Sequence, residues 1–184
     1  MIVRIIIILL CLVFFINGCN SLVSQFFGTH KLRSFEVSDV AEKGIGDADY
    51  VEISGARFEP VFVHQEASEP GSPPIIVYPV FAEGEGKKQA VLLAWTADFF
   101  DPCVAADSCI SAGVRTLKGV VRPIPDDNLA ALDSLREKGY SWVENPIVIN
   151  QDEDPIDWYW NALMMLGAAL VAIGMEAIYN RKKA

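Results

Sequence analysis

The chain has four cysteines and two histidines, the side chains that most often act as nucleophiles, bases or metal ligands. A serine or cysteine nucleophile needs a histidine base and an acid that orients the base. His30 follows the first apolar block, and His64 is expected where a strand ends at a loop. No G-x-S-x-G, H-E-x-x-H or phosphate-binding glycine loop is present in the sequence. We therefore expect no catalytic site, and an enzyme built on His64 with a nearby acid ranks third among three hypotheses.

Cys103 and Cys109 are the only cysteines outside the N-terminal block, in the segment CVAADSC. In an oxidising compartment an isolated pair this close predicts a small disulfide loop. A metal site would need more ligands, and neither histidine is near in the sequence. We expect no metal and no cofactor.

The C-terminal block predicts a transmembrane helix. Trp158 to Tyr179 is an apolar stretch of 22 residues, which as a helix is about 33 Å long and crosses a bilayer core. Aromatic residues stand at both ends, and Arg181, Lys182 and Lys183 follow. Basic residues after a span place that end in the cytoplasm. The alternative is a buried core helix, which the terminal position and the flanking residues disfavour.

Small residues gather within this predicted span and could let another helix approach closely. They are Gly167, Ala168, Ala169, Ala172 and Gly174. Glu176 is close enough to the basic end to extend its carboxylate to the interface, which is favoured over a functional charge inside the membrane. A partner helix, and so an integral membrane protein complex, is one expectation from this stripe.

The N-terminal block contains Arg4 and then twelve apolar residues, from Ile5 to Ile16. Twelve residues are short for a span and typical of a signal peptide. The following INGCNS resembles the lipobox of bacterial lipoproteins, which implies cleavage before Cys19 and lipidation of its thiol. In the rival interpretation the helix continues to Phe27 as an uncleaved anchor. Cleavage is slightly favoured, and both alternatives leave the following domain outside the cytoplasm.

Residues 28–155 are predicted to form one acidic domain between the two membrane blocks, 1–27 and 156–184. Four of the 15 basic residues lie at the two extremities, and of the 24 acidic residues only Glu176 lies within or after the apolar stretch that begins at Trp158. The residues between carry a charge of about −12, which repels nucleic acid phosphates. We therefore expect no nucleic acid partner. The expected location is a bacterial inner membrane, with the domain in the periplasm and the C-terminus in the cytoplasm.

Short segments with alternating apolar residues predict a mainly β domain. A small antiparallel barrel, partly open, or a sandwich is expected. Gly55 suggests a bulge or a tight turn, and Gly119 a bend. One amphipathic helix is predicted after Asp127 or Asn128, ending before Gly139. The predicted strands are 50–63, 75–84, 89–100, 114–124 and 140–150, and a turn at 83–88 joins the second and third strands as a hairpin. The connector 28–49 is expected to have short helical or extended character, and the acidic run 151–157 to be a solvated collar above the membrane.

The order of these strands resembles the Surfeit-locus family of cytochrome oxidase assembly proteins. The resemblance rests on Val51 to Pro60, on Ile75 to Phe81, on AVLLAWTADF, and on LKGVVRPIP with Gly119, Arg122 and Pro123. It implies a β-rich domain outside the cytoplasm with a membrane helix at each end, and a role in assembly. Ala94 stands where that family has Arg-Gly before the tryptophan, and the final span has no histidine. No haem site is therefore expected.

Two non-enzymatic functions remain ahead of the enzyme hypothesis. The first is a membrane-anchored accessory or assembly factor that acts through protein contacts. The alternative is a lipid-anchored envelope module that binds a ligand in an aromatic groove of the barrel, with Trp95, Phe99 and Trp142 as the candidate lining residues. Exposure of these three rings in one groove would favour the alternative.

Overall fold

The structure is a computed structural model in two compact units, one of membrane-type helices and one β domain. The first unit comprises Met1–Lys31 with Pro155–Ala184, and the second is Leu32–Asp154. The structure describes residues 2–66, 72–82, 84, 89–125, 129–143 and 145–181. The expected cap residues Asp127 and Asn128, and most of the expected turn at 83–88, lie outside these ranges.

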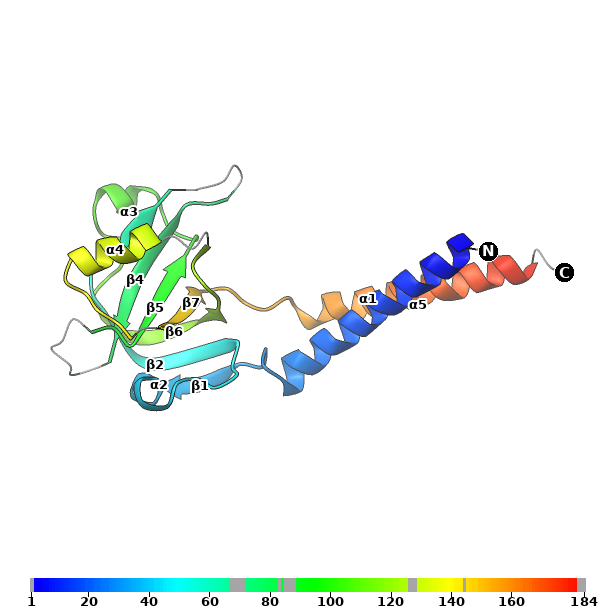
Figure 1. The fold of residues 1–184 in the computed structure, drawn as a ribbon, viewed down its shortest axis with the longest axis horizontal. Coiled ribbons are helices and arrows are strands. Elements are labelled where there is room, and N and C mark those ends of the chain that lie inside the picture. Colours follow the sequence, from blue (N-terminus) through cyan, green and yellow to red (C-terminus); the bar gives the residue numbers. More distant parts are fainter. Residues whose placement is uncertain are drawn as a thin grey trace. The chain divides into compact units, whose positions relative to one another are not determined.

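Five strands of the β domain close into a barrel (Figure 1). The sheet order is β1-β2-β6-β7-β5-β4-β3, and a further pairing of β2 with β4 joins the barrel ends at Arg57 and Phe58. The expectation of a barrel is confirmed and the sandwich alternative is wrong. The barrel is closed, whereas a partly open one was expected, because the pairing of β2 with β4 joins its two edges. The strands are β1 (Arg33–Glu36), β2 (Tyr50–Phe58), β3 (Val63–Gln65), β4 (Ile75–Phe81), β5 (Leu92–Thr96), β6 (Gly113–Val121) and β7 (Ile147–Gln151).

The barrel is not wholly antiparallel, which corrects the sequence-based expectation. β4 and β5 form the expected antiparallel hairpin, but β5 and β7 pair in parallel, with Leu92 opposite Ile147. The chain between them contains β6 and helix α4 (Leu129–Glu137). A long crossover of this kind is what a parallel pairing requires, because a tight turn can only join antiparallel neighbours.

The barrel interior is filled by side chains at alternating positions of its strands. Tyr78 and Phe58 are among the largest, and both rings are almost completely buried. Because side chains alternate across a strand, these positions share one face while their neighbours face outward. The interior cluster includes Val51, Ile53, Ala56, Ile76, Val80, Leu92, Ala94, Leu117 and Ile149. Small barrels of this size have room for packed side chains and little else.

A second cluster covers the outer face of β4 and β5. Leu93 and Trp95 alternate with the interior residues of β5, and they pack with Ala131 and Leu135 of α4. Figure 1 shows α4 lying beside β4 and β5. This explains why β4 and β5 are buried at every position, since both faces of the two strands are covered.

Four elements of this unit were not predicted as separate elements: β1, β3, α2 (Val37–Lys43) and α3 (Pro102–Ala105). The predicted strand 50–63 is divided into β2 and β3. β1 pairs in parallel with β2, α2 follows it directly, and α3 is a single turn. Val37 and Val40 of α2 join the interior cluster. The connector was expected only to have short helical or extended character, because seven helical residues are too few for periodicity to identify.

Two glycines shape the barrel. Gly55 has a left-handed backbone, φ 69°, where the β2–β6 register shifts between Ile53 and Ala56, so the predicted bulge is confirmed. Gly119 does not mark a bend. A Cβ atom there would overlap the Asn150 carbonyl oxygen and lie 2.8 Å from Ile149 Cγ2, so β6 passes β7 too closely for any other residue.

The helical unit contains α1 (Ile2–Phe27) and α5 (Trp158–Arg181), each apolar and long enough to span a membrane. Their 26 and 24 residues correspond to about 39 and 36 Å of helix. The first turn of α1 and the last turn of α5 lie side by side (Figure 1). α1 is one continuous helix through INGCNS, as the anchor interpretation requires.

Candidate functional site: the helix pair and its groove

α1 and α5 pack as an antiparallel pair along a regular seam. Residues recurring every seventh position of α1 are less exposed than most of their neighbours: Arg4, Cys11, Gly18 and Gln25. On α5, Asn161 and Ala168 are also seven positions apart, and both are buried. A repeat of seven residues keeps one stripe of each helix facing the other, as in coiled coils. The residues that face the other helix therefore recur with a seven-residue spacing in the sequence. The hydropathy of the two blocks does not show this spacing, because most of their residues are apolar.

The helices approach closely at Gly18. A Cβ atom added there would lie 2.6 Å from Met165 Cγ and 3.0 Å from the Asn161 carbonyl oxygen. Asn161 is only 6% exposed, and its Nδ2 atom has no hydrogen-bond partner among the described residues. Near the same end, Gln25 Nε2 donates to the Ile156 carbonyl oxygen. Small and amide side chains at such contacts are typical of helix association in membranes.

Arg4 and Glu176 form an ion pair at the other end of the seam. Arg4 Nε donates to Glu176 Oε1 at 3.2 Å, and Arg4 Nη2 contacts the same oxygen. The Arg4 guanidinium also lies 4.1 Å from the centre of the Tyr179 ring. Glu176 was expected to extend to the interface by itself. The structure instead gives its carboxylate a partner on α1, which lowers the cost of a charge in an apolar environment.

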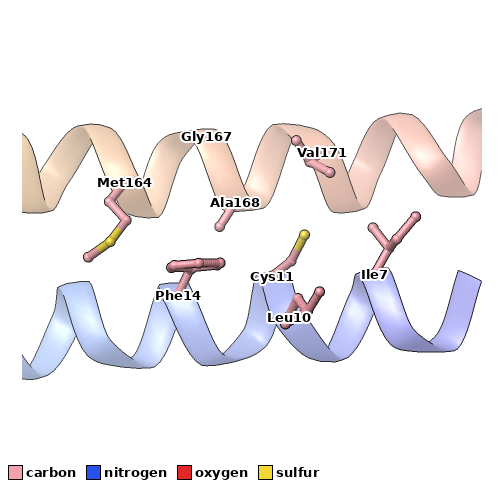
Figure 2. A pocket seen from close by; sticks show the side chains of 8 residues that line it. All are labelled: Ile7, Leu10, Cys11, Phe14, Met164, Gly167, Ala168 and Val171. Atoms are coloured by element: carbon pink, nitrogen blue, oxygen red, sulfur yellow. The ribbon is translucent and has the colours of Figure 1, made fainter.

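An apolar groove of about 420 Å³ runs between the two helices. Figure 2 shows its lining, with Cys11 and Phe14 pointing from α1 towards α5 on either side of Ala168. Gly167 leaves one wall without a side chain, and no atom lies within 4 Å of a Cβ placed there. The lining residues are Ile7, Leu10, Cys11, Phe14, Met164, Gly167, Ala168 and Val171.

The predicted small-residue stripe of α5 divides between two faces. Ala168 is buried on the seam, and Ala172 is half-buried four residues on. Gly167 is exposed, and Gly174 has open space around a Cβ position. One part of the stripe therefore contacts α1 of the same chain. At Gly167 and Gly174, no described atom beyond the local turns of α5 lies within 4 Å of a Cβ position, although Gly167 also lines the groove.

The cysteines fall into a linked pair in the β domain and free thiols on α1, as their positions in the sequence indicate. The Sγ atoms of Cys103 and Cys109 are at disulfide distance, and their Cα atoms are 4.8 Å apart. The pair links Cys103 within α3 to Cys109 after it, and Val104 and Cys109 pack on the interior cluster of the barrel. Cys19 is free and exposed on α1, one residue after the close approach at Gly18.

The aromatic residues proposed to line a barrel groove do not share one surface. Trp95 is 8% exposed, belongs to the outer cluster with α4, and donates from Nε1 to the Arg122 carbonyl oxygen at 3.3 Å. Trp142 packs against that same cluster. Phe99 instead packs against the interior cluster and contacts the His64 ring edge to face. These rings are mainly part of the packing.

His64 forms a pair with Glu66, with 3.7 Å between Nδ1 and Oε1. Glu66 is exposed, so solvent screens this interaction. Within the described ranges, no three histidine, cysteine, aspartate or glutamate side chains gather as a metal site.

The segment Asn150–Asp154 is tied to the barrel by polar contacts that the sequence did not predict. Tyr78 donates from inside the barrel to Gln151 Oε1, and burial raises the pKa of Tyr78. Glu153 pairs with Arg122 at 2.8 Å. Lys118 pairs with Asp154 at 2.8 Å, and Tyr50 donates to the same carboxylate. This acidic run was interpreted as a solvated collar, because spacing alone cannot show which cations meet it.

The hydrogen bond from Lys118 lowers the pKa of Asp154, and the hydrogen bond to Asp154 raises the pKa of Lys118. The lowered carboxyl pKa stabilises the fold above the unfolded value of about 4 and loses this effect as pH falls below it. The raised ammonium pKa stabilises below the unfolded value of about 10.5 and loses this effect above it. Stabilisation by the pair is therefore confined to the range between these limits.

We predict that Lys118→Met lowers the free energy of unfolding of the barrel by about 0.5 kcal/mol at pH 7, a small value because both side chains are substantially exposed. The difference from wild type should shrink as pH falls to 3. Chemical unfolding followed by tryptophan fluorescence at both pH values measures this. Glu137→Gln, at an exposed carboxylate on α4, serves as the control and should show no such trend. A Lys118→Met effect that grows in acid would contradict the prediction.

Comparison with known proteins found no matching family model, no matching curated protein and no matching solved structure.

Proposed function

We propose that this protein is a non-catalytic membrane-anchored accessory or assembly factor, which binds a helix of an integral membrane protein beside its own helix pair. The main support for the proposal is that the groove wall has no side chain at Gly167. A partner helix approaches most closely where a helix has no side chain. At Gly167 no described atom occupies the space that a side chain would fill.

The filled barrel supports a function based on surface contacts. Tyr78 and Phe58 occupy its interior together with aliphatic residues, and the Tyr78 hydroxyl is already bonded to Gln151. A ligand in the barrel would have to displace this packing, which has the density of a protein core. The separation of Trp95 and Phe99 into two clusters also gives the ligand-binding alternative no specific support.

The proposed orientation places the β domain in the periplasm of a bacterial inner membrane and the C-terminus in the cytoplasm. Its support is the position of the basic residues. Arg4 and the group at 181–183 flank the ends of the two helices that lie together, and basic residues favour the cytoplasmic side. The resemblance of the β2, β4, β5 and β6 sequences to the Surfeit-locus family supports a role in assembly.

Photo-crosslinking from α5 tests this function. A photo-reactive amino acid at Gly167 in the full-length protein, in its own membranes, should crosslink one membrane protein reproducibly. The same reagent at Ala177, which is exposed on α5 and does not line the groove, is the matched control. Equal labelling at both positions, or lipid adducts alone at Gly167, would contradict the proposal.

We further predict that Gly167→Leu weakens association with that partner at least about tenfold, equivalent to about 1.4 kcal/mol. A leucine side chain would occupy the space that the partner helix needs. The measurement is recovery of the crosslink-identified protein after gentle solubilisation, relative to wild type. Ala177→Leu should leave the recovery unchanged. Loss of recovery in both variants would show a general effect on the helix and count against a specific site.

A further inference from the structure

We propose that α1 remains in the mature protein and forms a membrane hairpin with α5, locked at one end by Arg4 and Glu176. In this arrangement Cys19 is an internal residue of a spanning helix, and it is not a lipidated N-terminus. The inference concerns processing and intramolecular pairing, and it holds whether or not a partner protein binds at Gly167.

The length of α1 removes the main reason for expecting cleavage. The twelve apolar residues from Ile5 to Ile16 are short for a span, but the helix continues to Phe27. The added turns contain Gly18, Asn20, Ser21 and Ser24. Gly18 is buried against α5, and Ser21 and Ser24 are half-buried. The polar side of the added segment is therefore partly covered by the partner helix, which lowers the cost of placing it in a bilayer.

Cleavage before Cys19 would remove Arg4, Cys11 and Gly18, and of the α1 seam residues only Gln25 would remain. Gly18 is the residue that Met165 and the Asn161 carbonyl oxygen approach. Without it, the Asn161 side chain, now only 6% exposed, would face the hydrocarbon. A polar amide in contact with lipid and without a partner is unfavourable.

Cleavage would also remove the cation that pairs with Glu176. Arg4 is 172 positions away in the chain but contacts Glu176 directly, and its guanidinium lies over Tyr179. A carboxylate near the end of a span is costly when alone and tolerated when paired. An arginine so close to the chain start is common before any signal segment, so its position is not informative. Its contact with an acidic residue of the other span is the informative observation.

Intact mass of the protein purified from bacterial membranes that contain active lipoprotein-processing enzymes is the first test. The expected result is a chain that still contains residues 2–18 and carries no lipid on Cys19. A chain that begins at a diacylated Cys19, or one cut elsewhere within α1, would overturn the proposal. This outcome is independent of the photo-crosslinking result at Gly167.

Intramolecular crosslinking then tests the hairpin itself. Figure 2 shows Cys11 pointing towards α5 beside Ala168. A short thiol-specific crosslinker should join Cys11 to the thiol introduced by Ala168→Cys in the full-length protein, with the linked peptides identified by mass spectrometry. Leu170→Cys, on an exposed position of α5, is the control and should give little of this product. Equal yields from both variants, or a Cys11 link found only between two chains, would overturn the hairpin.

Discussion

Gly119→Ala is expected to destabilise the barrel by about 3 kcal/mol, near the upper end of the usual cost of overpacking. The added Cβ would overlap the Asn150 carbonyl oxygen and press on Ile149. The oxygen belongs to the backbone of β7, and it cannot rotate away as a side chain can. β6 and β7 must therefore separate, or their register must change. The measurement is the denaturant midpoint of the full-length protein in detergent, followed by tryptophan fluorescence.

Thr116→Ala provides the control for this experiment. Thr116 is an exposed residue of the same strand, and its replacement should change the free energy of unfolding by less than about 0.5 kcal/mol. If Gly119→Ala does not fold at all, loss of the protease-resistant barrel in that variant and its retention in Thr116→Ala give the same conclusion. A midpoint equal to wild type for Gly119→Ala would show that the strands do not cross as closely as described.

Gly18→Leu is expected to separate α1 from α5 in the C-terminal half of α1. The first atom of the new side chain would lie 2.6 Å from Met165 Cγ and 3.0 Å from a backbone oxygen of α5. Met165 can move, but the backbone oxygen can move only with its helix. In the background of Ala168→Cys, we expect the yield of the crosslink to Cys11 to fall about tenfold, the change that about 1.4 kcal/mol of lost pairing would produce.

Val13→Leu is the matched control for Gly18→Leu. Val13 lies on α1 and is 53% exposed, so a larger side chain there should leave the crosslink yield unchanged. Undiminished crosslinking in Gly18→Leu would show that the close approach at Gly18 does not hold the pair together. The Arg4 and Glu176 contact would then be the main element of the hairpin.

Local patterns were sufficient for features that depend on neighbouring residues. The alternation of Val51 and Ile53 follows from a period of two, because one face of β2 is apolar. β4 and β5 are instead short continuous apolar runs, which turn residues between them divide into two strands. The apolar length of α5 and the spacing of Cys103 and Cys109 are likewise local properties. The bulge at Gly55 could be predicted because few residues other than glycine adopt its backbone conformation.

Local patterns could not predict the contacts between segments that are distant in the sequence. Nothing near Leu92 indicates that β7 lies beside it in parallel, or that Arg57 and Phe81 close the barrel. For the same reason Gly119 was interpreted as a bend. A glycine looks the same in the sequence whether it allows the backbone to bend or leaves space for a neighbouring strand. Only the position of Asn150 in the structure distinguishes the two roles.

The sequence by itself determined that two apolar helices flank an acidic, mainly β domain with one pair of linked cysteines. Apolar length, alternation and cysteine spacing are properties of the chain that need no knowledge of its neighbours. Tertiary structure decided that the sheet closes, that Glu176 meets Arg4, and that half of the small-residue stripe is covered by α1. Each of these features depends on how segments that are distant in the sequence align with one another. Arg4 and Glu176, for example, are 172 positions apart, and packing of the whole unit determines such contacts.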